Sequence, residues 1–223
     1  PLLCFLRDKG LDCSVINPII TKNSTNINIR KLHNDKFDSK KAALVGLNAS
    51  LKTSIIPDED IADLRNLVRD YYYFKDLQSA VVLKLNAELK VSFPAYLKVF
   101  SKITTQSSLK LLAAYPLAKD MLAAPKEELV GIIRSTARFG KAYALSRYEA
   151  ILEAAKDAAV FGRALPSNAV RIRLYIESYQ TYQKHLDSLL LALHEAVDKL
   201  QGTPVYDRIC LLQSLRGVGF LSA

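Results

Sequence analysis

Two aspartates three residues apart, Asp35 and Asp38, stand at the start of a predicted helix and are the residues best suited to chemistry. Residues at i and i+3 share a helix face, so their carboxylates would lie side by side and repel each other. A hard divalent ion such as Mg²⁺ relieves that repulsion. Basic residues close to the pair in sequence could hold a polyanion near the ion: Arg30, Lys31, Lys36, Lys40 and Lys41. This pattern is typical of a metal-dependent enzyme that acts on nucleic acid.

The same two aspartates also fit a purely structural role. Aspartate is common at helix starts because its carboxylate accepts hydrogen bonds from free N–H groups and interacts favourably with the helix dipole. The spacing of Asp35 and Asp38 by itself leaves both interpretations open.

A second candidate site lies near the end of the sequence, where residues 205–215 are predicted to form a helix. The tetrapeptide Arg216-Gly217-Val218-Gly219 then predicts a tight turn similar to that of a helix-hairpin-helix. Gly217 and Gly219 would let backbone N–H groups approach a phosphate closely, and Arg216 would add positive charge. The alternative is that the two glycines only terminate the helix.

The N-terminal elements that would position the aspartates are short. Residues 1–10 are predicted to form the end of a helix that closes at Gly10. Residues 11–16 are predicted to form a buried strand that stops before Pro18. Residues 19–32 are expected to form a loop, and residues 36–47 a helix.

Two long helices with a heptad pattern are predicted over residues 58–91 and 167–200, and we expect them to pack together. Shorter helices are predicted between them over 107–114, 126–136 and 142–161. The heptad seams are long enough for self-association, although pairing of the two helices within one subunit satisfies the same pattern. Their seam positions are Ile61, Leu64, Val68, Tyr71, Lys75, Gln78, Val82, Leu85 and Leu89, and Ile172, Ile176, Tyr179, Gln183, Leu186, Leu190, Leu193, Val197 and Leu200.

The composition favours a nucleic-acid partner and excludes several other classes. The 223 residues carry a formal net charge of +9 and a pI of about 9.4, as nucleic-acid-binding proteins often do. Three cysteines without a C-x-x-C motif argue against a zinc knuckle and a disulfide framework, and a reducing cytoplasm fits them. No apolar run reaches the roughly 18 residues that cross a membrane.

The order of several motifs resembles the DEDD-type insertion-sequence transposases, relatives of the Piv DNA invertases that are known as bridge-RNA-guided recombinases. The first set of residues is Gly10, Val15-Ile16-Asn17-Pro18, Asn34-Asp35, Asp38 and Ala42-Ala43. Later stretches resemble the family's middle segment and its entry to a second domain: Phe93-Pro94, Val99-Phe100, Ser107, Leu111-Leu112, Tyr115-Pro116, residues 124–129 and residues 215–223.

The resemblance implies a mainly α protein with a truncated RNase H-like (RuvC-like) α/β remnant, a coiled-coil helical bundle and the start of a helix-hairpin-helix-like domain. We expect these over residues 1–48, 49–202 and 203–223. Asp35 and Asp38 match the last two of four acidic Mg²⁺ ligands. The first Asp and the Glu are expected upstream and a serine nucleophile downstream, so that this chain would be an internal fragment without activity of its own.

The resemblance also implies the partners. DNA and a guide RNA are expected, together with self-association through the coiled-coil helices and a cytoplasmic, nucleoid-associated location in a bacterium or archaeon. Two other functions remain open on the residues alone. One is a non-catalytic helical scaffold that binds nucleic acid, and the other is a helical dimerisation or adaptor protein.

Overall fold

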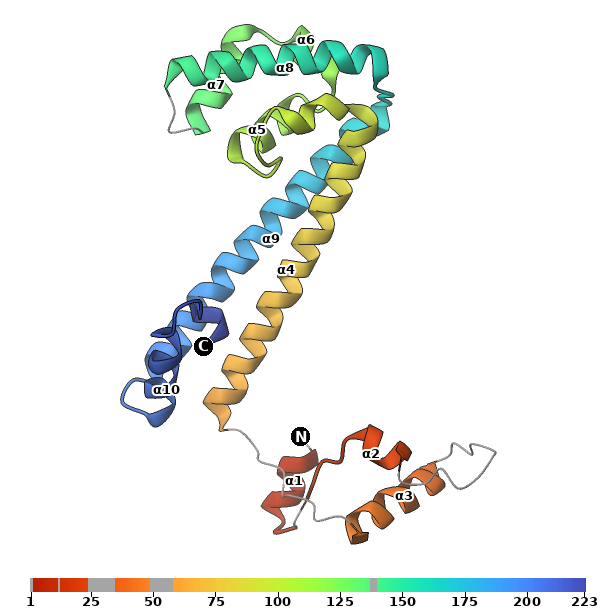
Figure 1. Ribbon diagram of the computed structural model, residues 1–223, viewed down its shortest axis with the longest axis vertical. Coiled ribbons are helices and arrows are strands. Elements are labelled where there is room, and N and C mark those ends of the chain that lie inside the picture. The colour runs from red at the N-terminus through yellow and green to blue at the C-terminus, as the bar shows by residue number, and fades with distance from the viewer. Residues whose placement is uncertain (1, 12, 24–34, 49–57, 137–139) are drawn as a thin grey trace. The chain divides into compact units, whose positions relative to one another are not determined.

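The computed structural model describes residues 2–11, 13–23, 35–48, 58–136 and 140–223 (Figure 1). Within these residues every regular element is a helix and none is a strand. The chain divides into two compact units, Pro1–Ala62 and Asp63–Ala223. The expectation of a mainly α protein is therefore confirmed. The RNase H-like remnant and the three expected domain boundaries remain predictions.

The described residues of the first unit form α1 (Leu2–Asp8), α2 (Pro18–Asn23), α3 (Asp35–Asn48) and the first residues of α4 (Glu59–Ser92). Of these helices, α2 packs on α3. Gly10 follows α1 with φ of +76°, a left-handed conformation that glycine adopts without steric cost. Val45 of α3 is the buried hydrophobic residue of the described part of this unit. Several large apolar side chains stay exposed, so this unit has little core of its own: Leu2, Phe5, Leu11, Val15, Ile19, Ile20, Leu44 and Leu47.

The strand predicted over residues 11–16 is wrong. The described residues of that stretch have no regular structure, and Val15 is 72% exposed. A strand is stable only when its backbone groups pair with a neighbour, and the described residues offer no neighbouring strand. The Asn-Pro pair that was expected to end the strand instead begins α2. The Oδ1 of Asn17 accepts a hydrogen bond from the backbone N–H of Ile19 at 3.0 Å, and Pro18 is the first helical residue.

The loop predicted over residues 19–32 is wrong in its first part for the same reason, because Ile19 to Asn23 belong to α2. The rest of that loop lies outside the described residues. The helix predicted over 36–47 is confirmed as α3, which begins one residue earlier and ends one residue later.

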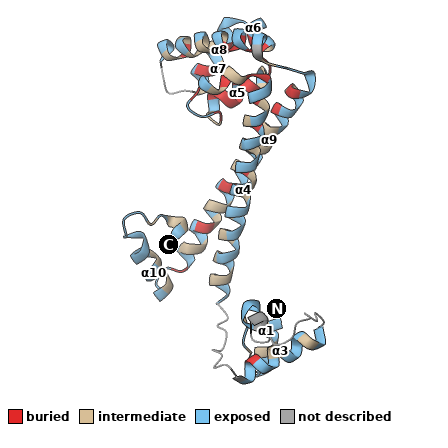
Figure 2. Ribbon diagram, turned by 45° about the vertical axis from the view of Figure 1, so that its right-hand side comes forward, coloured by how far each residue is buried: buried red, intermediate tan, exposed pale blue. Residues whose placement is uncertain are grey.

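Two helices of 34 residues each, α4 (Glu59–Ser92) and α9 (Pro166–Lys199), lie side by side in the second unit (Figures 1 and 2). Each spans about 50 Å at 1.5 Å per residue. They confirm the two predicted heptad helices to within a residue. Pro166 at the first turn begins α9, and the backbone N–H of Leu165 donates to Oδ1 of Asn168. Phe93 and Pro94 follow the end of α4.

The seam positions face the partner helix with one exception. The buried members are Gln78, Leu85, Leu89, Ile172, Ile176, Leu186, Leu193 and Leu200, and the remaining members are partly buried except for Lys75, which is exposed. The prediction is wrong at Lys75, because its neighbour Phe74 occupies the interface instead. The Phe74 ring lies 4.9 Å from the His185 ring and 6.2 Å from the Tyr182 ring, both on α9.

The helices between α4 and α9 form the hydrophobic core together with the adjoining ends of those two. They are the 3-10 helix η1 (Pro94–Lys98), α5 (Gln106–Ala114), α6 (Ala118–Ala123), α7 (Lys126–Thr136) and α8 (Lys141–Phe161). Figure 2 shows buried residues concentrated where α5, α7 and α8 pack together. The three predicted shorter helices are confirmed with their ends shifted by at most one residue.

The chain turns sharply between α8 and α9 at Gly162. The N–H of Arg163 donates to the carbonyl of Val91 at 3.0 Å, which brings the end of α8 against the end of α4. A Cβ atom on Gly162 would lie 2.6 Å from the Ala158 carbonyl oxygen and 2.9 Å from the Ser92 carbonyl oxygen. Both distances are too short for non-bonded atoms, so only glycine fits this crossing.

The last elements are α10 (Pro204–Gln213), a turn, and the 3-10 helix η2 (Phe220–Ser222). Thr203 begins α10 by accepting a hydrogen bond from the N–H of Tyr206 at 3.3 Å. The Phe220 ring stacks on the ring of His194 of α9 with 3.9 Å between centroids. This contact attaches the end of the chain to the long helix. Among the described helices, none combines the length and apolarity that a membrane span requires.

Candidate functional site

Asp35 and Asp38 lie in the first turn of α3, as the sequence predicts, and both are exposed. Their spacing of three residues places them on one side of the helix. Asp38 is already paired, because its Oδ1 lies 3.5 Å from the Nζ of Lys41 one turn later. Surface pairs of this kind contribute only about 0–1 kcal/mol, so Lys41 can give way to a cation of higher charge.

The lysines of α3 divide between two faces of the helix. Lys41 is three residues after Asp38 and shares its face, and the same ammonium lies 4.7 Å above the Phe37 ring. Lys36 and Lys40, four residues apart, share a different face and are both exposed. The expected contact of Lys36 and Lys40 with a polyanion near the carboxylates stays a prediction. Arg30 and Lys31 lie outside the described residues.

The carboxylates of α3 do not complete a metal site with other described residues. No group of three or more His, Cys, Asp or Glu side chains that could hold a metal occurs in the described part of the chain. Mg²⁺ requires six oxygen ligands in near-octahedral geometry. Two carboxylates supply only some of these oxygen ligands. The donors that α3 offers are of the right chemical kind but too few to hold this ion by themselves.

The second predicted site, residues 216–219, forms the expected turn. Gly217 has φ of +95°, and the N–H of Val218 donates to the carbonyl of Leu215 at 3.1 Å. Arg216, Gly217 and Gly219 are exposed. The three residues after Gly219 form a single 3-10 turn, so the described chain does not show the second helix of a helix-hairpin-helix. Phosphate contact at this turn remains a prediction.

A polar contact crosses the interface of α4 and α9 near its middle. Gln78 is 5% exposed, and its Nε2 donates a hydrogen bond to Oε1 of Gln183 at 2.9 Å. The Nε2 of Gln183 in turn donates to Oδ1 of Asp187 at 2.9 Å. Both glutamines are recognisable in the sequence as polar residues at seam positions. Their partnership follows only from the antiparallel arrangement of the two helices.

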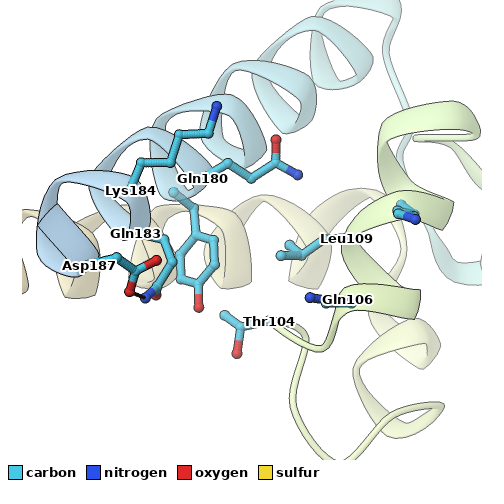
Figure 3. Close-up of a pocket in the computed structure, with 9 residues that line it drawn as sticks. Thr104, Gln106, Leu109, Gln180, Gln183, Lys184 and Asp187 are labelled. Carbon is cyan, nitrogen blue, oxygen red and sulfur yellow. Dashed lines mark hydrogen bonds between the residues drawn. The ribbon is translucent and has the colours of Figure 1, made fainter. Parts of the chain in front are cut away.

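A groove of about 720 Å³ lies beside this contact, between α9 and the start of α5 (Figure 3). Figure 3 shows Gln180, Gln183, Lys184 and Asp187 arriving from α9, with Gln106 and Leu109 on α5 and Thr104 just before it. The groove cannot be recognised in the sequence. No local motif marks it, because its two walls are about 75 residues apart in the sequence and meet only after α5 packs on α9.

One family model matches the N-terminal part of the chain. Residues 1–94 match the family model DEDD_Tnp_IS110, which is described as a transposase. The match contains α1, α2, α3 and all of α4, and therefore both aspartates. No curated protein and no solved structure matches the chain.

Proposed function

We propose that the chain acts in DNA transposition as part of a site-specific recombinase, because residues 1–94 match the model of a DEDD-type transposase family. In this proposal the complete enzyme cleaves and exchanges DNA strands with the assistance of a divalent metal. The family match carries the proposal, and it includes the helix that presents Asp35 and Asp38.

Asp35 and Asp38 are the proposed catalytic and metal-binding residues. They lie on one helix face and are exposed, and Lys41 is a weak competitor of the ion for Asp38. The other ligands of a Mg²⁺ ion must come from water, from nucleic-acid phosphates or from protein groups outside the described residues. We therefore propose that these 223 residues alone lack cleavage activity.

The basic residues of the same region have a positioning role in this proposal. Lys36 and Lys40 extend into solvent from a face of α3 away from the carboxylates, where they can contact the DNA backbone without reading its sequence. Lys41, Arg30 and Lys31 are proposed to act in the same way. Arg216, with the backbone of Gly217 and Gly219, is the proposed phosphate contact at the other end of the chain.

The partners we propose are DNA and a guide RNA, in the cytoplasm at the nucleoid. Self-association through the long helices is also proposed. Part of their heptad seam is already used within the chain, since α4 and α9 pack on each other. Other apolar residues of the pair remain exposed and could form an interface with a second copy: Leu83 at 71%, Leu174 at 53% and Leu191 at 62%.

Two alternatives are tested by simple measurements. A non-catalytic nucleic-acid-binding scaffold is favoured by the incomplete metal site of the described residues. It predicts binding without any requirement for Asp35 or Asp38. A helical adaptor without a nucleic-acid partner predicts no binding that weakens steeply with salt, because such weakening comes from counterions released from phosphates.

The experiment that tests the main proposal measures strand exchange by the intact transposase on plasmid substrates. Asp35→Asn and Asp38→Asn should each abolish exchange while circular dichroism shows unchanged helix content. Lys36→Gln, a matched neutralisation on the other face of α3, should reduce DNA affinity and leave cleavage of bound DNA unchanged. Exchange at the wild-type level in either aspartate variant would overturn the assignment.

A further inference from the structure

The groove between α5 and α9 contains polar side chains that are not used by the fold. Within the described residues, the side chains of Lys110, Lys184 and Gln180 form no hydrogen bond or ion pair with the protein. The same is true of Gln106 and of the Tyr179 hydroxyl. A groove that gathers several uncommitted donors and acceptors has the capacity to bind a polar ligand.

The charge of the groove favours an anion. Lys110 enters from α5 and Lys184 from α9, and both are exposed. The carboxylate that lines the groove belongs to Asp187, which accepts a hydrogen bond from Gln183. Two ammonium groups therefore face one carboxylate that already has a partner. Lysine ammonium groups are compact charges that suit phosphates.

The groove also has an apolar surface inside its polar rim. Leu109 is buried and Tyr179 is half-buried, and both line the groove. Tyr179 packs against the hydrophobic core as well, which fixes the position of its ring. A fixed aromatic ring beside lysines and amides is the combination that binds single-stranded nucleic acids, whose bases stack on the ring while phosphates meet the cations.

We propose that this groove is a binding site for single-stranded nucleic acid, with Lys110 and Lys184 on the phosphates and Tyr179 beneath a base. Gln106 and Gln180 provide adaptable hydrogen bonds to the base edges or the sugar. Because Tyr179 lies within the groove, only a base that has left its stack reaches the ring, which excludes an intact duplex. The site rests on the proposed nucleic-acid partner but not on chemistry at Asp35 and Asp38. It also lies outside residues 1–94, which the family model matches.

The test is fluorescence anisotropy with the 223-residue chain and a labelled oligouridine of about 12 nucleotides, a length within the usual range of single-strand sites. The double variant Lys110→Ala/Lys184→Ala is compared with Lys119→Ala/Lys156→Ala. The control removes the same charge from two exposed lysines outside the groove. Thermal unfolding followed by circular dichroism confirms that every variant is folded.

The groove variant should bind at least about tenfold more weakly than the control pair. Its plot of log affinity against log salt should also be less steep by about 1.4, since each phosphate contact on a single strand contributes roughly 0.7. Tyr179→Leu should weaken binding roughly tenfold through lost stacking, while Tyr179→Phe, which keeps the ring, should bind like the wild type.

Four results would overturn the proposal, and they separate it from the proposed function. Equal losses of oligouridine affinity in the groove and control variants would show that the groove is not the binding site, while the nucleic-acid function would stand. A loss of affinity confined to Lys36→Gln would lead to the same conclusion. Competition by duplex DNA as effective as that by the unlabelled oligouridine would remove the single-strand assignment. Absence of salt-dependent binding to any nucleic acid by the wild-type chain would remove both the groove and the proposed function.

Discussion

Gln78 on α4 and Gln183 on α9 are 105 residues apart in the sequence, yet their amides meet at 2.9 Å across the interface of the two helices. A buried polar pair adds little net stability but penalises every alignment that separates its members. It also restricts which helices can pair, as polar residues at heptad seams do in coiled coils. The contact therefore contributes to the register of α4 against α9, together with Glu88 of α4, which contacts Asn168 and Arg171 of α9. That register in turn sets the position of α9 relative to α5 and the groove.

Replacing one glutamine should cost more than replacing both. Gln183→Leu leaves the buried amide of Gln78 without its partner and should lower the free energy of unfolding by about 1–3 kcal/mol. The double variant Gln78→Leu/Gln183→Leu should recover most of that loss, because both polar groups are then gone. Denaturant unfolding of the single and double variants measures this coupling. Gln180→Leu, on an exposed position of the same helix, should change stability by less than about 0.5 kcal/mol.

The sequence pattern predicts the long helices well because heptad spacing is a local, repeated signal. It fails where two local rules compete. Lys75 satisfies the alternating steps as well as Phe74 does, but only Phe74 can bury a ring against His185. Asn17-Pro18 ends a strand as readily as it begins a helix. The hydrogen bond from the N–H of Ile19 to Oδ1 of Asn17 shows that the pair begins a helix in this chain.

The candidate sites also differ in how far a local sequence pattern predicts them. Asp35 and Asp38 are recognisable from spacing alone, since neighbours on one helix turn are neighbours in space. The splitting of the lysines of α3 between two faces also follows from helical geometry, once the start of the helix is known. The groove could not be predicted, because Lys110 and Lys184 are brought together only by the packing of α5 on α9.

Gly162→Ala should destabilise the second unit. The added methyl group would meet the backbone carbonyls of Ala158 and Ser92, neither of which can move without disturbing a helix end. The overpacking should lower the free energy of unfolding by about 1–3 kcal/mol. Gly131→Ala is the control, since its Cβ would enter open space in the middle of α7 and should stabilise the helix by about 0.5–1 kcal/mol. Equal melting temperatures for the two variants would show that the crossing is not tightly packed.

Tyr96 should make the fold sensitive to alkaline pH. Its side chain is fully buried, which raises the pKa of the phenol above the ordinary value of 10.0, although a hydrogen bond to Ser108 opposes the shift. The folded state thus holds the phenol proton more tightly than the unfolded chain does. The resulting stability is fully present below pH 10 and is lost as pH rises above it.

The comparison with Tyr96→Phe isolates this contribution. The wild type should lose more stability between pH 9 and pH 11 than the variant does, as measured by urea midpoints at each pH. Tyr96→Phe also loses the two hydrogen bonds to Ser108, each 3.2 Å long. That loss lowers the stability of the variant equally at both pH values, so it does not affect the change in stability between them. Parallel loss in the two proteins would assign the alkaline sensitivity to other groups.

Metal binding by α3 can be measured independently of DNA cleavage. Because the described residues supply only two carboxylates, and Lys41 competes for one of them, the 223-residue chain should bind Mn²⁺, a paramagnetic substitute for Mg²⁺, only weakly. Lys41→Gln removes the competing ammonium and should tighten Mn²⁺ binding. Asp38→Asn should weaken Mn²⁺ binding. Lys40→Gln removes the same positive charge from the other face of α3 and should change the Mn²⁺ affinity less than Lys41→Gln does. Paramagnetic broadening of the α3 backbone signals in NMR spectra locates the ion directly. Broadening centred elsewhere, or an equal response to Lys40→Gln and Lys41→Gln, would mean that the two aspartates only begin the helix.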